Sequence, residues 1–544
     1  MSLQLHPDAR GEAWLLALKG RLPAPSLVLP LLLLGLLRLP SLFEPHWYSD
    51  EAGYANTAYL MAHGKVLYLT VWNNKPPLLF WIYQLALGGF GPSELGLHLL
   101  SLVSEATALG GIWALARGWL SPRRTWAALL FSAFMLGTPL VNGDLALPES
   151  FLIALTVWGM VAVLAGLRAR STVRALWLAV AAGLLLGLAC LIQQTALADA
   201  VAALLVLLTA GWRGVRLGLA AGLSLGVTIA AVLAPFVVAA GAHRVFFFLV
   251  TSFAGYAQPA LGGGLLLVLP RVAAAVLLLA GVWATRGWPD RRRLSWVWLG
   301  CVLLVYVLPN RPYAHFLLPA IPALALVLAR LPRVHPRLLL HRVERAGRPL
   351  VASVALSGLL WAGVVAGGFT GGSLFTAKLT GEYYPVFVGR ALGLVSPVNY
   401  VSTYGAVPLA ERSAVAWMRA HRAANRTAVV WSPDSWAYLL ARLRPVLPAP
   451  PIYVDQEWLG TRRLLRRVTA RQPALILVTP GALTAYGPIA GVLRADYTRV
   501  AGIEPGQLWV RANVARRISR TRDATRGAGA GVAARGRPPT RRSA

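Results

Sequence analysis

The residues best suited to chemistry lie in one polar segment, residues 46–81, HWYSDEAGYANTAYLMAHGKVLYLTVWNNKPPLLFW. Ser49 or Asp50 can cap a helix that begins with Glu51, and the run to Met61 is amphipathic enough to lie along a membrane surface. The dipole of a helix favours an ionised carboxylate at its N-terminus. Asp50 is therefore suited to act as a general base or to hold a cation.

Lys75 precedes two prolines, which stiffen the chain and prevent a helix from continuing back through it. An ammonium group held there would attract a phosphate that arrives from the lipid. An acidic pair at a helix start is often only a cap, and Lys-Pro-Pro is often only a loop. Their combination at one membrane face favours a site, so we expect Asp50 and Lys75 to meet in one cavity that opens to lipid and to water.

Two further polar segments follow long apolar runs. Asp144 and Glu149 lie in VNGDLALPESF, where Glu149 is equally explained as an ordinary N-terminal carboxylate of a helix. The second segment, PNRPYAHFLLPAIP, contains Arg311, Tyr313 and His315. These three side chains could contact a phosphate, or they could anchor the segment at the membrane interface. Arg38, at the end of the first apolar run, is a weaker candidate for phosphate contact.

The elements that position these residues are predicted to be membrane-spanning helices. Of 544 residues, 57% are hydrophobic and 13% are charged, whereas soluble proteins contain about 25% charged residues. The mean hydropathy is +0.60. Cys190 and Cys301 both lie in apolar runs, which argues against a disulfide framework or a cysteine metal site.

The apolar runs predict an α-helical polytopic membrane protein, because each approaches the ~20 residues that cross a bilayer. The long first outer loop, 44–93, is expected to carry surface helices. Eleven spans are predicted, at about 24–43, 94–116, 125–141, 150–167, 175–192, 196–211, 217–240, 263–284, 295–309, 316–330 and 350–369.

Before residue 370, most of the arginines lie in alternate short loops between these spans. The net charge of +32 comes from 52 Lys and Arg against 20 Asp and Glu. Because basic loops face the cytoplasm, residues 1–23 are predicted to be cytoplasmic, in a multi-pass protein of the inner membrane. An odd number of spans then places the C-terminal domain and the candidate residues on the outer side. Since the charge is explained by topology, no nucleic-acid partner is expected.

The composition becomes that of a soluble domain after about residue 370. AERSAVAWMRAHRAA and LLRRVTARQ predict helices, and TAVVWS and ALILVT predict short buried strands. The predicted domains are therefore a transmembrane catalytic domain (24–370), a small extracytoplasmic α/β domain (371–511) and a disordered basic tail (512–544).

Motifs of several other protein classes are absent from the sequence. It contains no P-loop, no dinucleotide-binding glycine fingerprint after a strand and no H-E-x-x-H zinc motif. Inverted repeats with interrupted helices, which are typical of secondary transporters, are not apparent. A flippase for lipid-linked saccharides also predicts ionisable residues in the middle of spans, whereas nearly all of them here lie at span ends.

The order of these motifs resembles one known family. Asp50-Glu51 opens a surface helix and is followed by Tyr54, Gly64 and NNKPPLLFW, and then by GDLALPESFL and RPYAHFLLPAIPALALVLA. This order is similar to that of the protein mannosyltransferase-like glycosyltransferases, which include the lipid A aminoarabinose transferases. The resemblance covers most of residues 26–370 and implies a C-type glycosyltransferase fold.

The resemblance also implies the substrates and the roles of the candidate residues. The donor would carry its sugar on a polyprenyl phosphate in the membrane, and the acceptor would be an extracytoplasmic protein, lipid or polysaccharide. Asp50 would activate the acceptor as a base, and Glu51 would position it or hold a divalent cation, if one is used. Lys75 would contact the donor phosphate. Asp144 or Glu149 would be the second acidic residue.

A carboxylate base and a cationic phosphate contact favour a single displacement with inversion. A double displacement would need a second carboxyl group about 5 Å away from the first. Two alternatives to an enzyme are a flippase for lipid-linked saccharides and a catalytically inactive scaffold whose outer domain binds partners.

Overall fold

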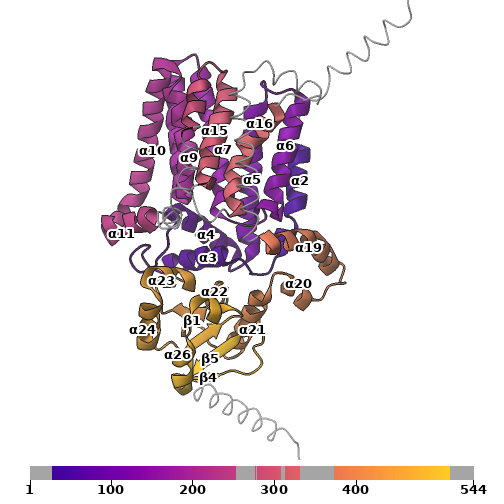
Figure 1. The fold of residues 1–544 in the computed structure, drawn as a ribbon, viewed down its shortest axis with the longest axis vertical. Helices are drawn as coiled ribbons and strands as arrows, with labels where there is room; N and C mark the ends of the chain where they lie inside the picture. The colour runs from indigo at the N-terminus through magenta and orange to yellow at the C-terminus, as the bar shows by residue number, and fades with distance from the viewer. Residues whose placement is uncertain (1–26, 253–275, 277, 308–312, 331–372, 515–544) are drawn as a thin grey trace, which may run out of the picture. The chain divides into compact units, whose positions relative to one another are not determined.

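The computed structural model describes residues 27–252, 276, 278–307, 313–330 and 373–514, and these form two compact units (Figure 1). Unit 1 consists of described residues within Met1–Phe43 and Asn74–Pro385, and unit 2 of those within Glu44–Asn73 and Val386–Ala544. The first part of the predicted outer loop therefore belongs to the same unit as the C-terminal α/β region.

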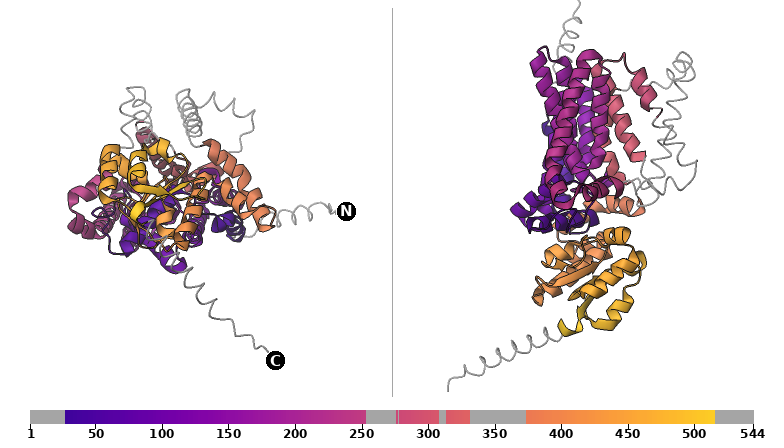
Figure 2. Two further views of the ribbon diagram at one scale, coloured as in Figure 1. Left: turned by 90° about the horizontal axis from the view of Figure 1, so that it is seen from below. Right: turned by 90° about the vertical axis from the view of Figure 1, so that its left-hand side faces the viewer.

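Most of the helices of unit 1 form a bundle and run side by side in perpendicular views (Figures 1 and 2). The α-helices of the unit are α2 (Val28–Arg38), α4 (Pro77–Phe90), α5 (Glu94–Ala116), α6 (Pro122–Gly137), α7 (Pro148–Arg168), α8 (Thr172–Ile192), α9 (Leu197–Leu208), α10 (Gly211–Ala240), α11 (Ala242–Phe246), α15 (Asp290–Val307) and α16 (Ile321–Arg330). Two of them, α4 and α11, lie across one end of the bundle (Figures 1 and 2). The short turns of the unit are η1 (Pro40–Phe43), η2 (Pro139–Val141), η3 (Gln194–Ala196), η4 (Phe247–Thr251) and η5 (Ala314–Ala320). A further helix, α19 (Ser373–Ala391), crosses the boundary between the units.

Proline starts several of these helices at a position where its missing N–H costs nothing. Pro77, Pro122 and Pro148 each occupy the first turn of a helix. The helices are apolar on most sides, and α7 packs between α5 and α8, with Val157 and Met160 fully buried. A helix that is apolar all round is typical of a membrane span or of the interior of a large bundle.

Four described helices are long and apolar enough to cross a membrane, namely α5, α7, α8 and α10. Shorter apolar helices lie at Val28–Phe43, Pro77–Phe90, Gln194–Leu208, Ala242–Thr251 and Ala314–Arg330. The predicted span 350–369 lies outside the described residues, as does most of 263–284. The helical membrane character is confirmed, and the number of eleven spans stays a prediction.

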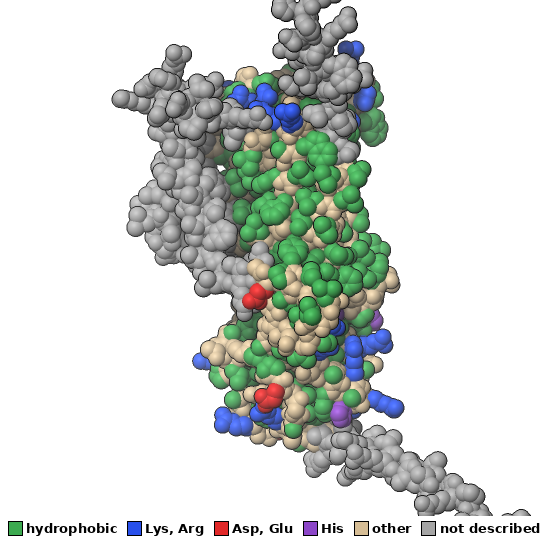
Figure 3. Space-filling view, turned by 90° about the vertical axis from the view of Figure 1, so that its right-hand side faces the viewer, with side chains coloured by type: hydrophobic (Ala, Val, Ile, Leu, Met, Phe, Trp, Pro, Cys, Tyr) green, Lys and Arg blue, Asp and Glu red, His purple; other side chains and the backbone are tan. Residues whose placement is uncertain are grey.

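The arginine-rich loops of unit 1 contact one another at one end of the bundle. Arg291 donates a hydrogen bond to the carbonyl of Arg117 at 3.0 Å, and Arg213 donates one to the carbonyl of Gly166 at 3.4 Å. Figure 3 shows Lys and Arg side chains gathered at this end, above a flank covered by hydrophobic side chains. Tryptophan rings lie beneath several guanidinium groups, in the pairs Trp113–Arg117, Trp119–Arg330, Trp212–Arg216, Trp283–Arg286 and Trp288–Arg292. Such an aromatic and basic belt is typical of a membrane interface.

Unit 2 contains a five-stranded mixed sheet with helices on both faces (Figure 1). The strands are β1 (Thr427–Trp431), β2 (Arg444–Pro445), β3 (Leu475–Val478), β4 (Tyr497–Arg499) and β5 (Gln507–Arg511), in the order β2-β1-β3-β5-β4. β1 pairs in parallel with β2 and β3, whereas β5 is antiparallel to β3 and β4. The helices are α3 (Ser49–Ala62), α20 (Pro397–Thr403), α21 (Ala406–Ala420), α22 (Trp436–Leu440), α23 (Ile452–Leu459), α24 (Thr461–Arg471), α25 (Ala482–Tyr486) and α26 (Ala490–Asp496).

The alternation of side chains along the central strand explains why helices cover both faces. Ala428 and Val430 of β1 pack in a cluster with α21 and α22, whereas Val429 and Trp431 pack in a second cluster with α24 and α26. The two predicted strands and the two predicted helices of this region are confirmed as β1, β3, α21 and α24. Within the described residues, the sequence reading missed β2, β4 and β5. The described chain ends at residue 514, so the predicted disordered tail lies almost wholly outside it.

Candidate functional site

The acidic pair lies in the first turn of α3, in unit 2. α3 begins at Ser49, and its N-cap residue, Tyr48, makes no side-chain cap bond. The predicted cap by Ser49 or Asp50 is therefore wrong. The helix starts two residues earlier than predicted, so Ser49 and Asp50 are its first two residues. The predicted amphipathic surface helix is also wrong, since every residue from Glu51 to Ala58 is buried.

Asp50 is held by a residue from the far end of the sequence. The hydroxyl of Tyr453, in α23, donates a hydrogen bond to Oδ1 of Asp50 at 3.0 Å, and Asp50 stays partly exposed. This contact fixes the orientation of the side chain that the sequence identifies as the candidate base.

The rest of α3 packs tightly against the C-terminal part of unit 2. The Asn56 side chain donates a hydrogen bond to the carbonyl of Ser435 at 2.8 Å. A Cβ at Gly53 would lie 2.8 Å from the ring of Pro451, so only glycine permits this approach. Tyr54, the tyrosine of the motif, is 6% exposed. The motif helix is thus an integral part of unit 2.

Two buried carboxyl groups lie in unit 2 beyond α3. Asp434 accepts a hydrogen bond from the backbone N–H of Trp436, and Glu411 is 2% exposed. Burial, with a smaller contribution from the charge of Glu51, raises the pKa of Asp434 to about 7, although its backbone hydrogen bonds act in the opposite direction. Burial and the neighbouring Asp434 also raise the pKa of Glu411 well above its usual value. Both groups are favoured in their neutral form.

This burial predicts how the stability of unit 2 changes with pH. A carboxyl group whose pKa is higher in the folded state stabilises that state fully below about pH 4, and this stabilisation is lost as the pH rises to about 7. We therefore expect the thermal unfolding temperature of unit 2 to fall as the pH rises from about 4 to about 7. Asp434→Asn should make the stability of unit 2 less dependent on pH. Hydrogen exchange of the β1 and β3 amides, measured at several pH values, reports this stability. An unchanged pH slope in the variant would contradict the assignment.

Lys75 lies in unit 1, in a loop whose two sides are both fixed. Gln194 donates hydrogen bonds from its side-chain amide to the carbonyls of Asn74, at 2.6 Å, and Leu249, at 3.1 Å. After the lysine, Pro76 is extended and Pro77 begins α4. The ammonium group is therefore carried on a rigid backbone, as the two prolines predict.

The second aromatic and basic segment lies near this lysine. The rings of Tyr313 and His315 are stacked, with centroids 5.4 Å apart and an interplanar angle of 7°. His315 is buried and interacts electrostatically with Lys75, whereas Tyr313 is 44% exposed. Arg311 lies outside the described residues. Within unit 1, Lys75 thus lies close enough to His315 for its charge to act on the ring.

The acidic loop between η2 and α7 is fixed by three side chains. Arg38 donates a hydrogen bond to the carbonyl of Gly143 at 2.6 Å, Tyr83 donates one to that of Ala146 at 2.7 Å, and Ser150 donates one to that of Leu145 at 3.0 Å. A Cβ at Gly143 would lie 2.4 Å from a backbone oxygen, so the tight turn requires glycine. The carboxylates of this loop are consequently presented on a fixed backbone.

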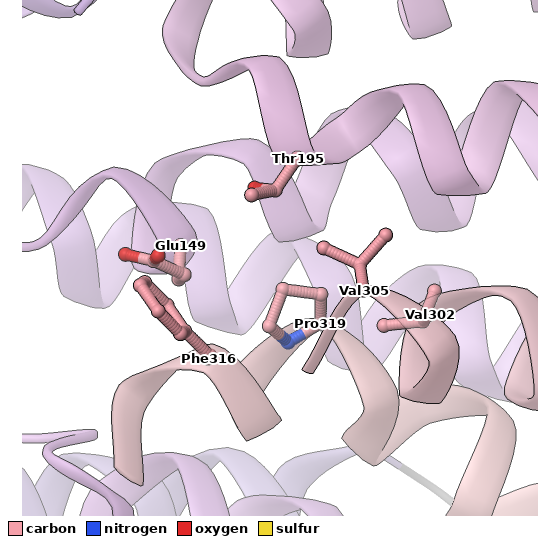
Figure 4. Close-up of a pocket in the computed structure, with 6 residues that line it drawn as sticks. All are labelled: Glu149, Thr195, Val302, Val305, Phe316 and Pro319. Carbon is pink, nitrogen blue, oxygen red and sulfur yellow. The ribbon is translucent and has the colours of Figure 1, made fainter. Parts of the chain in front are cut away.

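Asp144 and Glu149 are both 1% exposed, but their surroundings differ. Gln193 donates a hydrogen bond to Oε1 of Glu149 at 2.8 Å. Glu149 also lines a cavity of about 10 Å³, with Thr195, Val302, Val305, Phe316 and Pro319 (Figure 4). Asp144 does not line this cavity and instead acts electrostatically on Glu105.

Arg38 is fully buried and pairs with Glu105 across 3.5 Å, and both side chains are 0% exposed. Its guanidinium group also donates a hydrogen bond to the hydroxyl of Ser101. A guanidinium group engaged in this way does not reach a lipid phosphate, so the structure removes Arg38 from the candidates for phosphate contact. Its role is to hold the acidic loop.

Two residue types that bind metals lie one turn apart at the start of α5. Nε2 of His98 is 3.6 Å from Oε2 of Glu94, and Nδ1 of His98 bonds to the carbonyl of Ser41 at 2.6 Å. A carbonyl oxygen only accepts, so the ring proton is on Nδ1 and the lone pair of a neutral ring is on Nε2. This pair could contribute two ligands to a divalent cation, which is the cofactor that the sequence left open.

Several residues of these sites were missed by the sequence reading. Gln193 and Gln194 were not predicted as site residues, although two adjacent amides between apolar runs are themselves a signal for buried hydrogen bonds. Tyr453 and Ser435 gave no signal, because their partners lie about 400 residues earlier in the chain.

Residues 74–239 match a family model described as dolichyl-phosphate-mannose-protein mannosyltransferase. No curated protein sequence matches the chain. Among solved structures, ArnT from Cupriavidus metallidurans bound to undecaprenyl phosphate is similar, with a TM-score of 0.57 and 20% identity over 90% of this chain and 98% of that chain.

The apo state of the same ArnT has a TM-score of 0.54 and 19% identity, with the same coverage of both chains. Identity at this level shows a shared fold. The resemblance read from the sequence motifs is confirmed: the chain has the fold of ArnT and, over residues 74–239, the sequence pattern of the mannosyltransferase family.

Proposed function

We propose that this protein is a membrane glycosyltransferase that moves a sugar from a polyprenyl-phosphate donor to an extracytoplasmic acceptor. The observation that carries the proposal is Lys75, a cation on a backbone fixed by Gln194 and two prolines, in an apolar helical unit. An ammonium in this setting suits the phosphate of a membrane lipid. The family match and the fold shared with ArnT, whose structure holds undecaprenyl phosphate, support the same reading.

In the proposed reaction the acceptor hydroxyl oxygen attacks the anomeric carbon of the sugar. Asp50 takes the hydroxyl proton as the new carbon–oxygen bond forms. The bond between the anomeric carbon and the phosphate oxygen breaks on the opposite side, so the configuration inverts. Lys75 then stabilises the charge on the departing lipid phosphate, with Tyr313, His315 and Arg311 as further contacts. Glu51 positions Asp50 or holds a cation.

Either Asp144 or Glu149 supplies the second acidic group of the proposed site. Glu149 is favoured because it lines a cavity, whereas Asp144 lies beside the Arg38–Glu105 pair. The Gln193 amide keeps one oxygen of Glu149 in place. A carboxyl oxygen held in this manner can accept a hydrogen bond from a sugar hydroxyl.

The proposal includes the location of the protein. The basic end of unit 1 faces the cytoplasm, as does the N-terminus, and the C-terminal domain is extracytoplasmic. The membrane is the inner membrane, which the chain crosses several times. The transmembrane catalytic domain and the outer α/β domain are proposed near the limits predicted from the sequence, with 44–73 added to the latter.

A flippase is the alternative function, and it requires ionisable residues along a pathway through the bundle. Glu105, in the middle of α5, and Asp199, in the first turn of α9, are buried acidic residues of unit 1 that such a pathway would use. Both are engaged, because Glu105 pairs with Arg38 and Asp199 accepts a hydrogen bond from the indole N–H of Trp298 at 2.6 Å. These contacts join helices to one another and favour the enzyme over the flippase.

The proposed role of Lys75 is tested by lipid binding. Lys75→Met should weaken the binding of undecaprenyl phosphate to the purified full chain about 10- to 100-fold, because a charge-assisted hydrogen bond contributes about 1.5–3 kcal/mol. Native mass spectrometry in detergent measures this affinity. Lys65→Met, at an exposed lysine of unit 2, is the matched control and should change it less than twofold. Equal affinities in both variants would remove Lys75 from the donor site.

A further inference from the structure

Helix α24 of unit 2 has an exposed face made almost only of arginine. Its eleven residues, Thr461–Arg471, contain arginines at 462, 463, 466, 467 and 471 and no acidic residue. Leu464 and Val468 are the buried side chains that attach the helix to the sheet. All five arginines are exposed. The function proposed above uses none of them.

The spacing of these arginines places them in two rows along the helix. Arg462 and Arg466 form one row, and Arg463, Arg467 and Arg471 form the other, because residues four apart lie on the same side of a helix. Neighbouring charges within a row are about 6 Å apart along the axis. Like charges at this spacing repel and destabilise an isolated helix. An anionic partner would remove this repulsion.

The surroundings neutralise little of the positive charge of this face, and the carboxyl group that acts on it, Asp455 beside Arg467, is buried. Most of the acidic residues of unit 2 are buried, among them Glu411, Asp434 and Asp455. Arg467 lies over the ring of Trp72, with 5.6 Å between the guanidinium carbon and the ring centroid, so one arginine of the face is anchored. Within the described residues, none of the five forms an ion pair within 4 Å.

We propose that the arginine face of α24 is a docking surface for a soluble linear polyanion, such as a glycan that carries phosphate or carboxylate groups. Guanidinium groups bind both kinds of anion with two parallel hydrogen bonds. The other exposed residues of the helix are Thr469 and Ala470, so it offers no large apolar side chain for insertion into a bilayer. This absence favours a soluble polymer over a lipid surface. The inference does not depend on the proposed sugar transfer.

The experiment uses the purified full chain in detergent and fluorescently labelled inorganic polyphosphate as the probe. The variant Arg462→Gln/Arg463→Gln/Arg466→Gln/Arg471→Gln keeps Arg467 on Trp72, and glutamine has a helix propensity close to that of arginine. We expect fluorescence anisotropy to show at least about tenfold weaker binding, with a smaller dependence on salt. Circular dichroism and thermal unfolding check that the variant folds.

A second variant with the same change of charge is the matched control. Arg390→Gln/Arg412→Gln/Arg422→Gln/Arg442→Gln alters four other exposed arginines of unit 2 and should weaken binding less than threefold. Equal weakening by both variants, or no binding of polyphosphate by the unchanged chain, overturns the proposal. Hydrogen exchange in nanodiscs provides a third arm. If phosphatidylglycerol nanodiscs protect the backbone amides of 461–471 in the absence of polyphosphate, the face binds lipid, and this result also overturns the proposal.

Discussion

Replacing Asp50 with Asn is expected to lower the rate of sugar transfer about 10²- to 10⁴-fold, which is the usual contribution of a general base. The amide has almost the same size as the carboxyl group and still accepts the hydrogen bond of Tyr453, so the fold of α3 should not change. Only the capacity to take the proton of the acceptor hydroxyl is lost. The measurement is transfer of labelled sugar from polyprenyl-phosphate donors to envelope acceptors in membrane vesicles.

Two controls separate loss of chemistry from loss of structure. The Asp50→Asn chain should bind undecaprenyl phosphate and unfold at the same temperature as the unchanged chain. Tyr453→Phe removes the hydrogen bond but keeps the carboxylate, and it should reduce transfer far less than Asp50→Asn. If the Asn variant keeps more than about a third of the rate, Asp50 is not the base.

The second large effect is expected at the buried ion pair of unit 1. Arg38→Met leaves the Glu105 carboxylate buried without its partner and removes the hydrogen bond to the carbonyl of Gly143. Breaking a buried pair on one side costs about 3–5 kcal/mol of folding free energy. We expect a correspondingly lower thermal unfolding temperature of the detergent-solubilised chain.

The double variant Arg38→Met/Glu105→Leu distinguishes an ion pair from simple packing. Replacing both partners by apolar groups is often nearly neutral, so the double variant should recover most of the lost stability. Any remaining loss measures the contact between Arg38 and the acidic loop. A double variant that is less stable than either single variant would show that the two side chains do not act as a pair.

Local patterns predicted the elements of this protein well. The short apolar run TAVVWS and the helical period of AERSAVAWMRAHRAA each identify an element that the structure contains. Both signals are local, because they depend only on the order of apolar and polar residues within one element. The two prolines after Lys75 likewise predicted a fixed loop before α4. The strands β2 and β4 are only two and three residues long, which is too short for an alternating pattern of polar and apolar residues to be recognised.

Contacts between distant parts of the chain explain what the sequence did not show. α3 looked like a surface helix because its own residues are mixed in polarity, but Asn56 bonds to Ser435 and Gly53 packs against Pro451. The burial of a helix depends on these partners, and no local pattern identifies them. Arg38 looked like a phosphate contact for the same reason, since Glu105 lies in another helix.

The assembly of α3 into unit 2 has a consequence for the synthesis of the protein. A ribosome completes the motif helix early, yet Ser435, Pro451 and Tyr453 emerge only after most of the chain has been made. During that interval the helix lacks the residues that bury it and orient Asp50. A chain released before the α/β region is translated therefore contains the whole acidic motif but not the support that arranges it.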